Sequence, residues 1–215
     1  MMKNIKAILF DMDGVLVDTE DLHCKSYISA LKRYEIKLTE EEYFEEWTQK
    51  GKGIKDYLKE KKIKLDAEEI RSVKRAIYHQ MLKKQLMLMP GIKTLLEKSK
   101  LAYKTALVSS SYRVDIDLIV KLTNIGKYFD VIIAKDDVKK VKPEPESFLL
   151  AAKLLEIEPR NCIVVEDAEK GVVAAKRAGM ICIAIPCRYT MNNDFSLANY
   201  RVEKPSDVLP ILKKY

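Results

Sequence analysis

Short apolar runs alternate with amphipathic stretches through most of this chain. Residues 5–10, IKAILF, form an apolar run that predicts a buried strand. Four more apolar runs predict strands, and periodic stretches between and after them predict helices: strands at 104–110, 130–134, 161–166 and 180–185, and helices at 113–123, 145–156, 168–178 and 206–213. Strands that alternate with helices over short loops are typical of a parallel sheet covered on both faces. We therefore predict an α/β fold with a Rossmann-like parallel sheet core.

Residues 20–89 break this alternation, because they contain helical patterns and no strand-like run. The helical patterns lie at 21–34, 39–47, 52–61 and 66–86. Pro90-Gly91 ends the stretch, and the α/β pattern then resumes. We predict a core domain formed by residues 1–16 and 90–215 and an inserted all-helical cap domain at 17–89. Since the insertion follows the first strand directly, it can act as a lid that excludes water and selects the substrate.

The composition is that of a folded, water-soluble protein of 215 residues, with 47% hydrophobic and 33% charged positions. No apolar run approaches the ~18–20 residues of a membrane span. The first ten residues lack the cleavage region of a signal peptide. The four cysteines form no CxxC pair, which favours free thiols in a reducing compartment. We therefore expect a cytoplasmic protein without a membrane anchor, either monomeric or weakly homodimeric.

The formal charge of +7 raises the question of nucleic-acid binding. Lys and Glu are interleaved throughout the chain, as in KEKKIKLDAEEI at 59–70, which is typical of solvated helix faces. The chain has no basic stripe studded with aromatic residues, the pattern that single-strand binders use. We therefore expect no nucleic-acid partner, and a modest positive field that steers small anionic metabolites toward the protein.

Polar side chains follow the predicted strands at the points where these strands end. Asp11 and Asp13 follow the first strand, and Ser109, Ser110 and Ser111 end the second. Lys142 lies in a loop, and Glu166 and Asp167 follow a later strand. Because the carboxyl ends of parallel strands meet at one edge of a sheet, these side chains can converge.

Each of these residue types can handle a phosphoryl group. Mg²⁺ prefers hard oxygen ligands, which Asp11, Glu166, Asp167 and the backbone carbonyl of Asp13 can supply. Lys142, Ser109 and Ser110 can bind phosphate through charge and hydrogen bonds, with help from the amides of the helix that follows. One carboxylate can attack phosphorus to give an aspartyl-phosphate, and the acid two residues further on can transfer protons.

The motifs DMDGVLVDTE, LVSSS, KPEPESF and VVEDAEKGVVAAKRAGM resemble those of the haloacid dehalogenase-like hydrolase superfamily, in the branch with a helical cap after the first strand. That branch includes β-phosphoglucomutase and phosphatases of small metabolites. The resemblance implies that Asp11 is the nucleophile and Asp13 the general acid/base. The remaining motif positions follow from the same resemblance: Ser109 and Lys142 for phosphate, Glu166 and Asp167 for the metal, and Gly171, Ala174 and Ala175 as small residues that let the next helix pack close to the site.

The resemblance also indicates which cap residues select the substrate. His23 lies where many relatives of the mutase carry a histidine at the cap hinge, and Lys50, Gly51 and Lys52 form the KG region of the cap. Ile54 occupies the position at which mutase-like proteins place an arginine for the second phosphate of a bisphosphate. Lys52 or Lys55 could supply a positive charge there, but an amine cannot reproduce the bidentate fork of a guanidinium group.

The missing arginine favours a Mg²⁺-dependent phosphatase of small phosphomonoesters, such as sugar phosphates, over a phosphosugar mutase. A third possibility comes from another class of protein, a phosphoreceiver or phosphate-binding module without turnover. Continuous release of phosphate from excess substrate would distinguish an enzyme from such a module.

Overall fold

The computed structural model describes residues 4–215, which divide into two compact units. One unit contains Met87–Tyr215 together with the chain up to Asp18, and the other contains Thr19–Leu86. We call them the sheet unit and the helical unit. The sequence pattern placed the corresponding boundaries at 16/17 and 89/90, within a few residues of these divisions. Among the described residues, none of the helices combines the length and the apolar character that crossing a membrane requires.

The sheet unit is built on one parallel sheet of six strands. In chain order the strands are β1 (Ala7–Phe10), β2 (Lys104–Val108), β3 (Val131–Ile133), β4 (Cys162–Glu166), β5 (Ile181–Ala184) and β6 (Tyr200–Arg201). Their spatial order is β3-β2-β1-β4-β5-β6, and every pairing is parallel. The predicted Rossmann-like α/β core is confirmed. The two-residue strand β6 was not predicted, because it is too short to show an alternating pattern.

The strand order places the end of β1 in the middle of the sheet. From β1 the chain first adds β2 and β3 on one side, and later adds β4, β5 and β6 on the other, so the order of the strands switches beside β1. Ligands of such sheets bind where the strand order reverses, outside the carboxyl ends of the strands. Phe10 at the end of β1 is level with Leu107 and Val165. The residues that follow β1, β2 and β4 are therefore neighbours.

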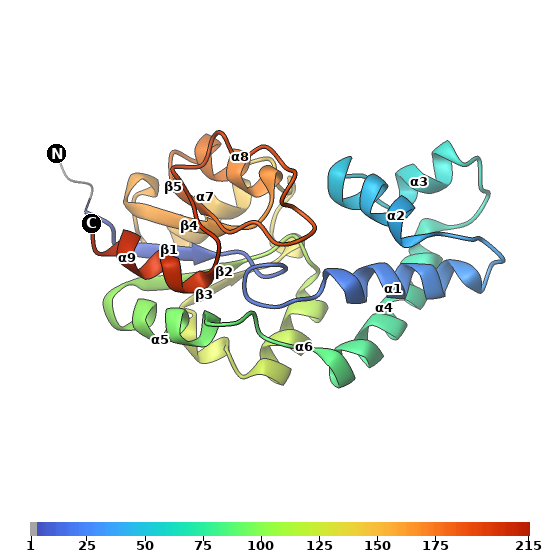
Figure 1. Cartoon of the computed structure of the whole chain (residues 1–215), viewed down its shortest axis with the longest axis horizontal. Coiled ribbons are helices and arrows are strands. Elements are labelled where there is room, and N and C mark those ends of the chain that lie inside the picture. The colour runs from blue at the N-terminus through green and yellow to red at the C-terminus, as the bar shows by residue number, and fades with distance from the viewer. Residues whose placement is uncertain (1–3) are drawn as a thin grey trace. The chain divides into compact units, whose positions relative to one another are not determined.

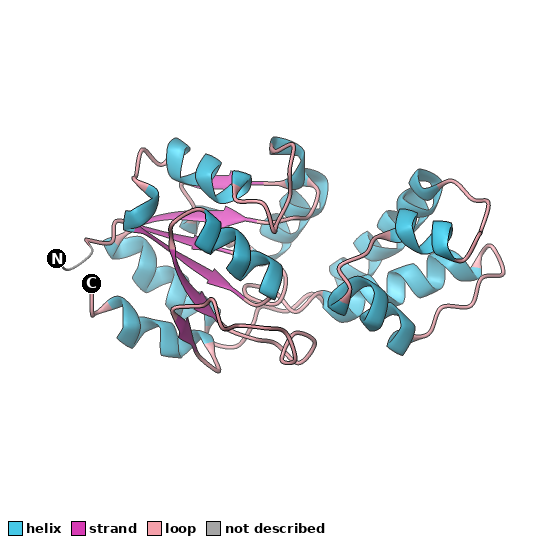
Figure 2. Cartoon of the chain, turned by 90° about the horizontal axis from the view of Figure 1, so that it is seen from above, coloured by secondary structure: helices cyan, strands magenta, loops and turns pink. Residues whose placement is uncertain are grey.

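Helices cover both faces of this sheet (Figure 2). Figure 1 shows α7 and α8 on one face and α5 and α6 on the other. The helices of this unit are α5 (Ile92–Ala102), α6 (Arg113–Thr123), α7 (Glu146–Leu154), α8 (Glu169–Arg177) and α9 (Val208–Leu212). Helix α5 was not predicted from the sequence. It forms where Ile92, Leu95 and Leu96 bury a helical apolar face.

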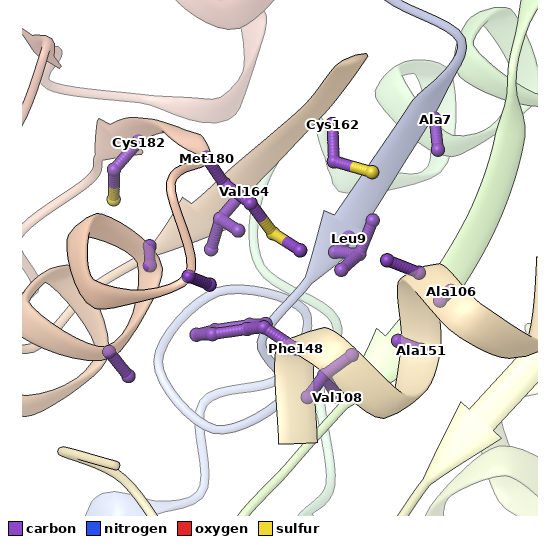
Figure 3. Close-up of a cluster of buried hydrophobic side chains, with 14 of the residues drawn as sticks. Ala7, Leu9, Ala106, Val108, Phe148, Ala151, Cys162, Val164, Met180 and Cys182 are labelled. Atoms are coloured by element: carbon purple, nitrogen blue, oxygen red, sulfur yellow. The ribbon is translucent and has the colours of Figure 1, made fainter. Parts of the chain in front are cut away.

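The face covered by α7 and α8 carries small and medium apolar side chains. Leu9 and Val108 project from the strands toward Phe148 and Ala151 of α7 (Figure 3). Phe148 is fully buried in this cluster. A buried aromatic ring of this size makes many close contacts, so it holds α7 against the sheet, at the end of the loop that precedes this helix. That loop carries Lys142.

The helical unit consists of α1 (Glu20–Lys32), α2 (Glu40–Tyr43), a π-helical turn at Phe44–Gln49, α3 (Ile54–Glu60) and α4 (Ala67–Gln85). The Thr39 side chain accepts a hydrogen bond from the Glu42 N–H at the start of α2, as its capping-box spacing indicates. Tyr43 and Trp47 stack with ring centroids 5.1 Å apart in the core of the unit. This unit therefore has its own hydrophobic core, separate from that of the sheet unit.

Candidate active site

Lys142 is the centre of the charged group at the carboxyl edge of the sheet. Its ammonium donates hydrogen bonds to Asp11 Oδ1 at 2.5 Å, to Glu166 Oε1 at 2.5 Å and to the carbonyl oxygen of Val108 at 3.0 Å. Only 2% of its side chain is exposed. The three acceptors come from the ends of β1, β4 and β2, so this lysine joins the three central strands.

Glu166 is the last residue of β4, and Asp167 follows it in the short connection to α8. Glu166 Oε2 accepts hydrogen bonds from the N–H groups of Asp167 and Ala168, at 3.0 and 3.1 Å. Asp11, Glu166 and Asp167 each offer one oxygen, and these oxygens all lie within 4.8 Å of one another. The Asp13 carboxylate is not a member of this group. A ligand role for the Asp13 backbone carbonyl stays a prediction.

The residues of this acidic group are suited to bind a hard divalent cation. Its donors are carboxylate oxygens, which suit Mg²⁺, and its three carboxylates outnumber the Lys142 ammonium. Burial, together with the carboxylates of Glu166 and Asp13, raises the pKa of Asp11 to about 8, although Lys142 acts in the opposite direction. Burial alone would lower the pKa of Lys142, but Asp11 and Glu166 hold it above its ordinary value. A second positive charge would relieve the repulsion among the acids.

Two glycines make room for these acids, because neither has a side chain that would occupy the same space. A Cβ at Gly14 would lie 2.3 Å from Asp167 Oδ2, and a Cβ at Gly171 would lie 1.9 Å from Glu166 Cδ. Gly14 also has a φ of +80°, a conformation that glycine adopts readily and other residues avoid. The DxDG motif thus needs its glycine for the backbone turn and for the close approach of Asp167.

Asp13 lies beside the serines that follow β2. Its Oδ2 accepts a hydrogen bond from Ser111 Oγ at 2.9 Å and lies 3.5 Å from Ser109 Oγ. Ser109 is buried, its Oγ accepts a hydrogen bond from the Ser111 N–H, and Ser110 beside it is half-buried. The sequence places Ser111 among the polar side chains at this strand end but assigns it no role. The third serine of the SSS run was a signal, but the sequence does not show which hydroxyl turns toward Asp13.

His23 lies in the helical unit, in contact with a residue that sequence reasoning missed. His23 Nδ1 is 2.6 Å from the Nζ of Lys74, and its ring stacks on Tyr78 with centroids 4.2 Å apart. Lys74 is buried, and its ammonium lies 4.0 Å from the centroid of Tyr78. Helix α4 also carries Lys83 and Lys84, so the sequence alone did not single out Lys74.

Lys50 and Lys52 flank Gly51 in the loop before α3, and both are engaged in ion pairs. Lys50 Nζ lies 2.6 Å from Glu45 and 2.8 Å from Glu46, while Lys52 Nζ lies 2.8 Å from Glu46 and 2.7 Å from Glu60. Ile54, at the position where mutase-like proteins carry an arginine, is fully buried in the core of the helical unit. Hydrophobic packing therefore occupies that position.

Comparison with known proteins assigns the family. The sequence profile of the haloacid dehalogenase-like hydrolases matches residues 8–185. The "Phosphorylated carbohydrates phosphatase" of Thermotoga maritima is 31% identical, over 98% of this chain and 99% of its own length. "Pyrophosphatase PpaX" of Bacillus velezensis is 32% identical, over 97% of each chain. The crystal structure of CbbY from Rhodobacter sphaeroides in complex with phosphate is 27% identical, covers 95% of this chain and 96% of its own, and has a TM-score of 0.87.

The chain therefore belongs to the haloacid dehalogenase-like hydrolases. Relatives that match along nearly the whole chain include proteins named as phosphatases, and it is an enzyme of the phosphoric monoester hydrolase class. The family generally uses a divalent metal, for which Asp11, Glu166 and Asp167 supply a buried acidic cluster.

Proposed function

We propose that this chain is a Mg²⁺-dependent phosphatase that hydrolyses small phosphomonoesters through a phosphoryl group carried transiently by Asp11. The observation that supports the proposal most strongly is the convergence of Asp11, Glu166 and Asp167 around a buried lysine at the switch point of the sheet. When bound there, Mg²⁺ would neutralise charge on the phosphoryl oxygens. Lys142, Ser109 and Ser110 would bind the same oxygens from the protein side.

The reaction divides into two displacements at phosphorus. A carboxylate oxygen of Asp11 forms a bond to phosphorus while the bond from phosphorus to the ester oxygen breaks, and Asp13 gives its proton to the departing alcohol. Asp13 then takes a proton from water, whose oxygen attacks the aspartyl-phosphate and releases inorganic phosphate and free Asp11. The hydrogen bond from Ser111 supports this role, because it fixes one oxygen of Asp13 beside the serines that we propose bind the phosphoryl group.

We propose a sugar phosphate or a related metabolite as the substrate and the cytoplasm as the location. The 31% identity to a protein named for phosphorylated carbohydrates supports the first, and four free cysteines support the second. His23, Lys50, Gly51 and Lys52 remain our candidates for substrate selection. The alternatives are a phosphosugar mutase and a phosphate-binding module without turnover. Ile54 argues against the mutase, since its buried apolar side chain cannot grip a second phosphate.

The test is phosphate release from a panel of phosphorylated metabolites that includes sugar phosphates, pyrophosphate and β-glucose 1-phosphate with its bisphosphate activator. We expect many turnovers per enzyme with Mg²⁺ and none with a chelator. Asp11→Asn should lower kcat by roughly three orders of magnitude or more. The matched control is Asp117→Asn, which changes an exposed carboxylate on α6. Near-normal turnover by Asp11→Asn would exclude the covalent route, and a single turnover by the wild type would favour the binding module.

A further inference from the structure

The loop that follows β5 brings two side chains to Asp167. Cys187 Sγ donates a hydrogen bond to Asp167 Oδ2 over 3.3 Å, and Thr190 Oγ1 lies 3.5 Å from the same oxygen. Thr190 is buried and Cys187 is half-buried. Neither residue belongs to the four motifs of the family resemblance. Their contact with Asp167 therefore calls for a separate explanation.

The loop delivers these side chains through a closed turn. The Cys187 N–H donates to Thr190 Oγ1 at 3.0 Å, and the Thr190 N–H donates to the Cys187 carbonyl at 3.1 Å. The start of the loop is fixed as well, because the Ile185 N–H donates to the Glu166 carbonyl at 2.7 Å. The turn is thus anchored to the strand that carries the acids, and its two side chains have little freedom to leave Asp167.

Asp167 Oδ2 is confined from a second direction by Gly14. The space at Gly14 is so small that a Cβ there would lie 2.3 Å from Oδ2. The turn at Cys187 and Thr190 and the backbone at Gly14 therefore both limit where this oxygen can lie. This arrangement fixes the plane of the carboxylate, and with it the position of the other oxygen.

The other two acids of the group are positioned differently, by one shared lysine. Asp11 and Glu166 both accept hydrogen bonds from the Lys142 ammonium. The thiol of Cys187 is outside the group of ligand atoms that, among residues 4–215, lie within 4.8 Å of one another. It contacts Asp167 without joining the acidic group, which is the arrangement of a residue that orients a ligand.

We propose that Cys187 and Thr190 are positioning residues that hold Asp167 in the orientation required for metal binding. This inference rests on the proposed metal site and extends it to residues outside the motifs. Groups that orient the ligands of a metal typically change its affinity by about 10- to 100-fold when they are removed. Both side chains act on the metal through Asp167, so their loss should weaken metal binding more than it slows the reaction at saturating metal.

The test measures how tightly the metal-free protein binds Mn²⁺. The electron paramagnetic resonance signal of unbound Mn²⁺ gives the bound fraction by difference. Thr190→Val keeps the shape of the side chain and removes the hydroxyl, and Cys187→Ala removes the thiol. Thr190→Ser and Cys187→Ser keep a donor. We expect the first two variants to raise the dissociation constant of Mn²⁺ by about 10- to 100-fold and the serine variants to restore most of the affinity. At saturating Mg²⁺, kcat should stay close to that of the wild type.

The matched control is Thr123→Val, since the Thr123 hydroxyl donates to the Ile119 carbonyl of its own helix at 2.7 Å. Thermal unfolding checks that each variant is folded. If folded Thr190→Val and Cys187→Ala bind Mn²⁺ as the wild type does, the positioning role is excluded while the proposed function stands. A serine variant as weak as its apolar counterpart would also exclude it. A wild type that binds neither Mn²⁺ nor Mg²⁺ would overturn the metal site itself, and this inference with it.

Discussion

Each unit of this protein contains lysines placed between two acids, at nearly the same distances. In the sheet unit, Lys142 lies 2.5 Å from Asp11 and from Glu166. In the helical unit, Lys50 lies 2.6 Å from Glu45 and 2.8 Å from Glu46. The side chain of Lys142 is 2% exposed, whereas that of Lys50 is 44% exposed. The distances from lysine to carboxylate are therefore similar in the two units, and the two sites differ in how far the lysine is exposed to solvent.

Burial decides what such a pair contributes. Water and salt screen an exposed pair, and ordering two long side chains offsets most of the attraction. In a buried group the acids cannot be solvated, so the lysine is required once the acids are there. Proteins rarely keep buried charges without a function, and the buried set in this chain coincides with the switch point of the sheet. Ion-pair distances alone would not have distinguished the two units.

The largest difference between the units should appear when the lysines are replaced by methionine. Lys142→Met leaves Asp11 and Glu166 buried without their shared cation, so we expect the loss of about 3–5 kcal/mol of stability near neutral pH and of nearly all phosphatase activity. Lys50→Met should leave the unfolding midpoint almost unchanged. Thermal unfolding and phosphate release under identical conditions check both. Equal effects of the two substitutions on stability would contradict the comparison.

The next largest difference should appear when a glycine in each unit is replaced by alanine. Gly171 lies inside α8, where alanine would ordinarily stabilise a helix by about 1 kcal/mol. At this site the new Cβ would overlap Glu166, which Lys142 and two backbone N–H groups hold in place. We therefore expect Gly171→Ala to destabilise the protein by about 1–3 kcal/mol and to weaken metal binding.

Gly53 in the helical unit is the matched control for this substitution. A Cβ at Gly53 would have its nearest neighbour at 3.9 Å, an ordinary contact. Gly53→Ala should therefore have a much smaller effect on thermal unfolding. A stabilised and fully active Gly171→Ala would show that Glu166 can move, and that the acidic group is less rigid than the structure indicates.

The sequence was informative about the acids because a parallel sheet aligns the ends of its strands. An apolar run that stops at Asp11 and another that stops at Glu166 must meet if β1 and β4 are neighbours, and they are. The fold and the convergence of these residues could therefore be predicted. The roles of Asp11 as nucleophile and Asp13 as acid/base stay predictions until they are tested.

Residues in turns and on long helices could not be predicted in the same way. Ser111, Thr190 and Lys74 reach their partners through loop geometry or through one face of a helix, which hydrophobic periodicity does not specify. The sequence does not predict α5, because the helix starts directly after Pro90-Gly91, a pair that indicates the end of the insertion. The side chains are therefore missed because the pattern specifies side-chain directions poorly, whereas α5 is missed because a turn signal lies directly before it.

The pH dependence of stability should have opposite signs in the two units. The pKa of Asp11 is about 8 in the folded protein and 3.8 for an ordinary aspartate, so the folded state binds more protons between these values. Its contribution to stability therefore falls as the pH rises from 3.8 toward 8. In a chelator, Asp11→Asn should gain stability relative to the wild type across this range, as unfolding curves at several pH values would show. A difference that does not vary with pH would mean that Asp11 titrates normally.

Glu46 in the helical unit should give the smallest effect, with the reverse sign. Hydrogen bonds from Lys50 and Lys52 lower the pKa of Glu46 from 4.5 to about 2, so its stabilising contribution is complete above 4.5 and is lost as the pH falls toward 2. The Glu46 side chain is only 13% exposed, but its partners Lys50 and Lys52 are 44% and 25% exposed, so water screens these pairs and the depressed pKa should yield little stability. The difference between Glu46→Gln and the wild type should be small at neutral pH and low salt, and should vanish both in acid and at about 1 M salt, where the Debye length is about 3 Å. Unfolding midpoints in a grid of pH and salt would show this. If Glu46→Gln still differs from the wild type in stability at high salt, the ion pairs of Glu46 are as poorly screened as those of Asp11 and Glu166. Exposure of the lysine would then not explain the difference between the two sites.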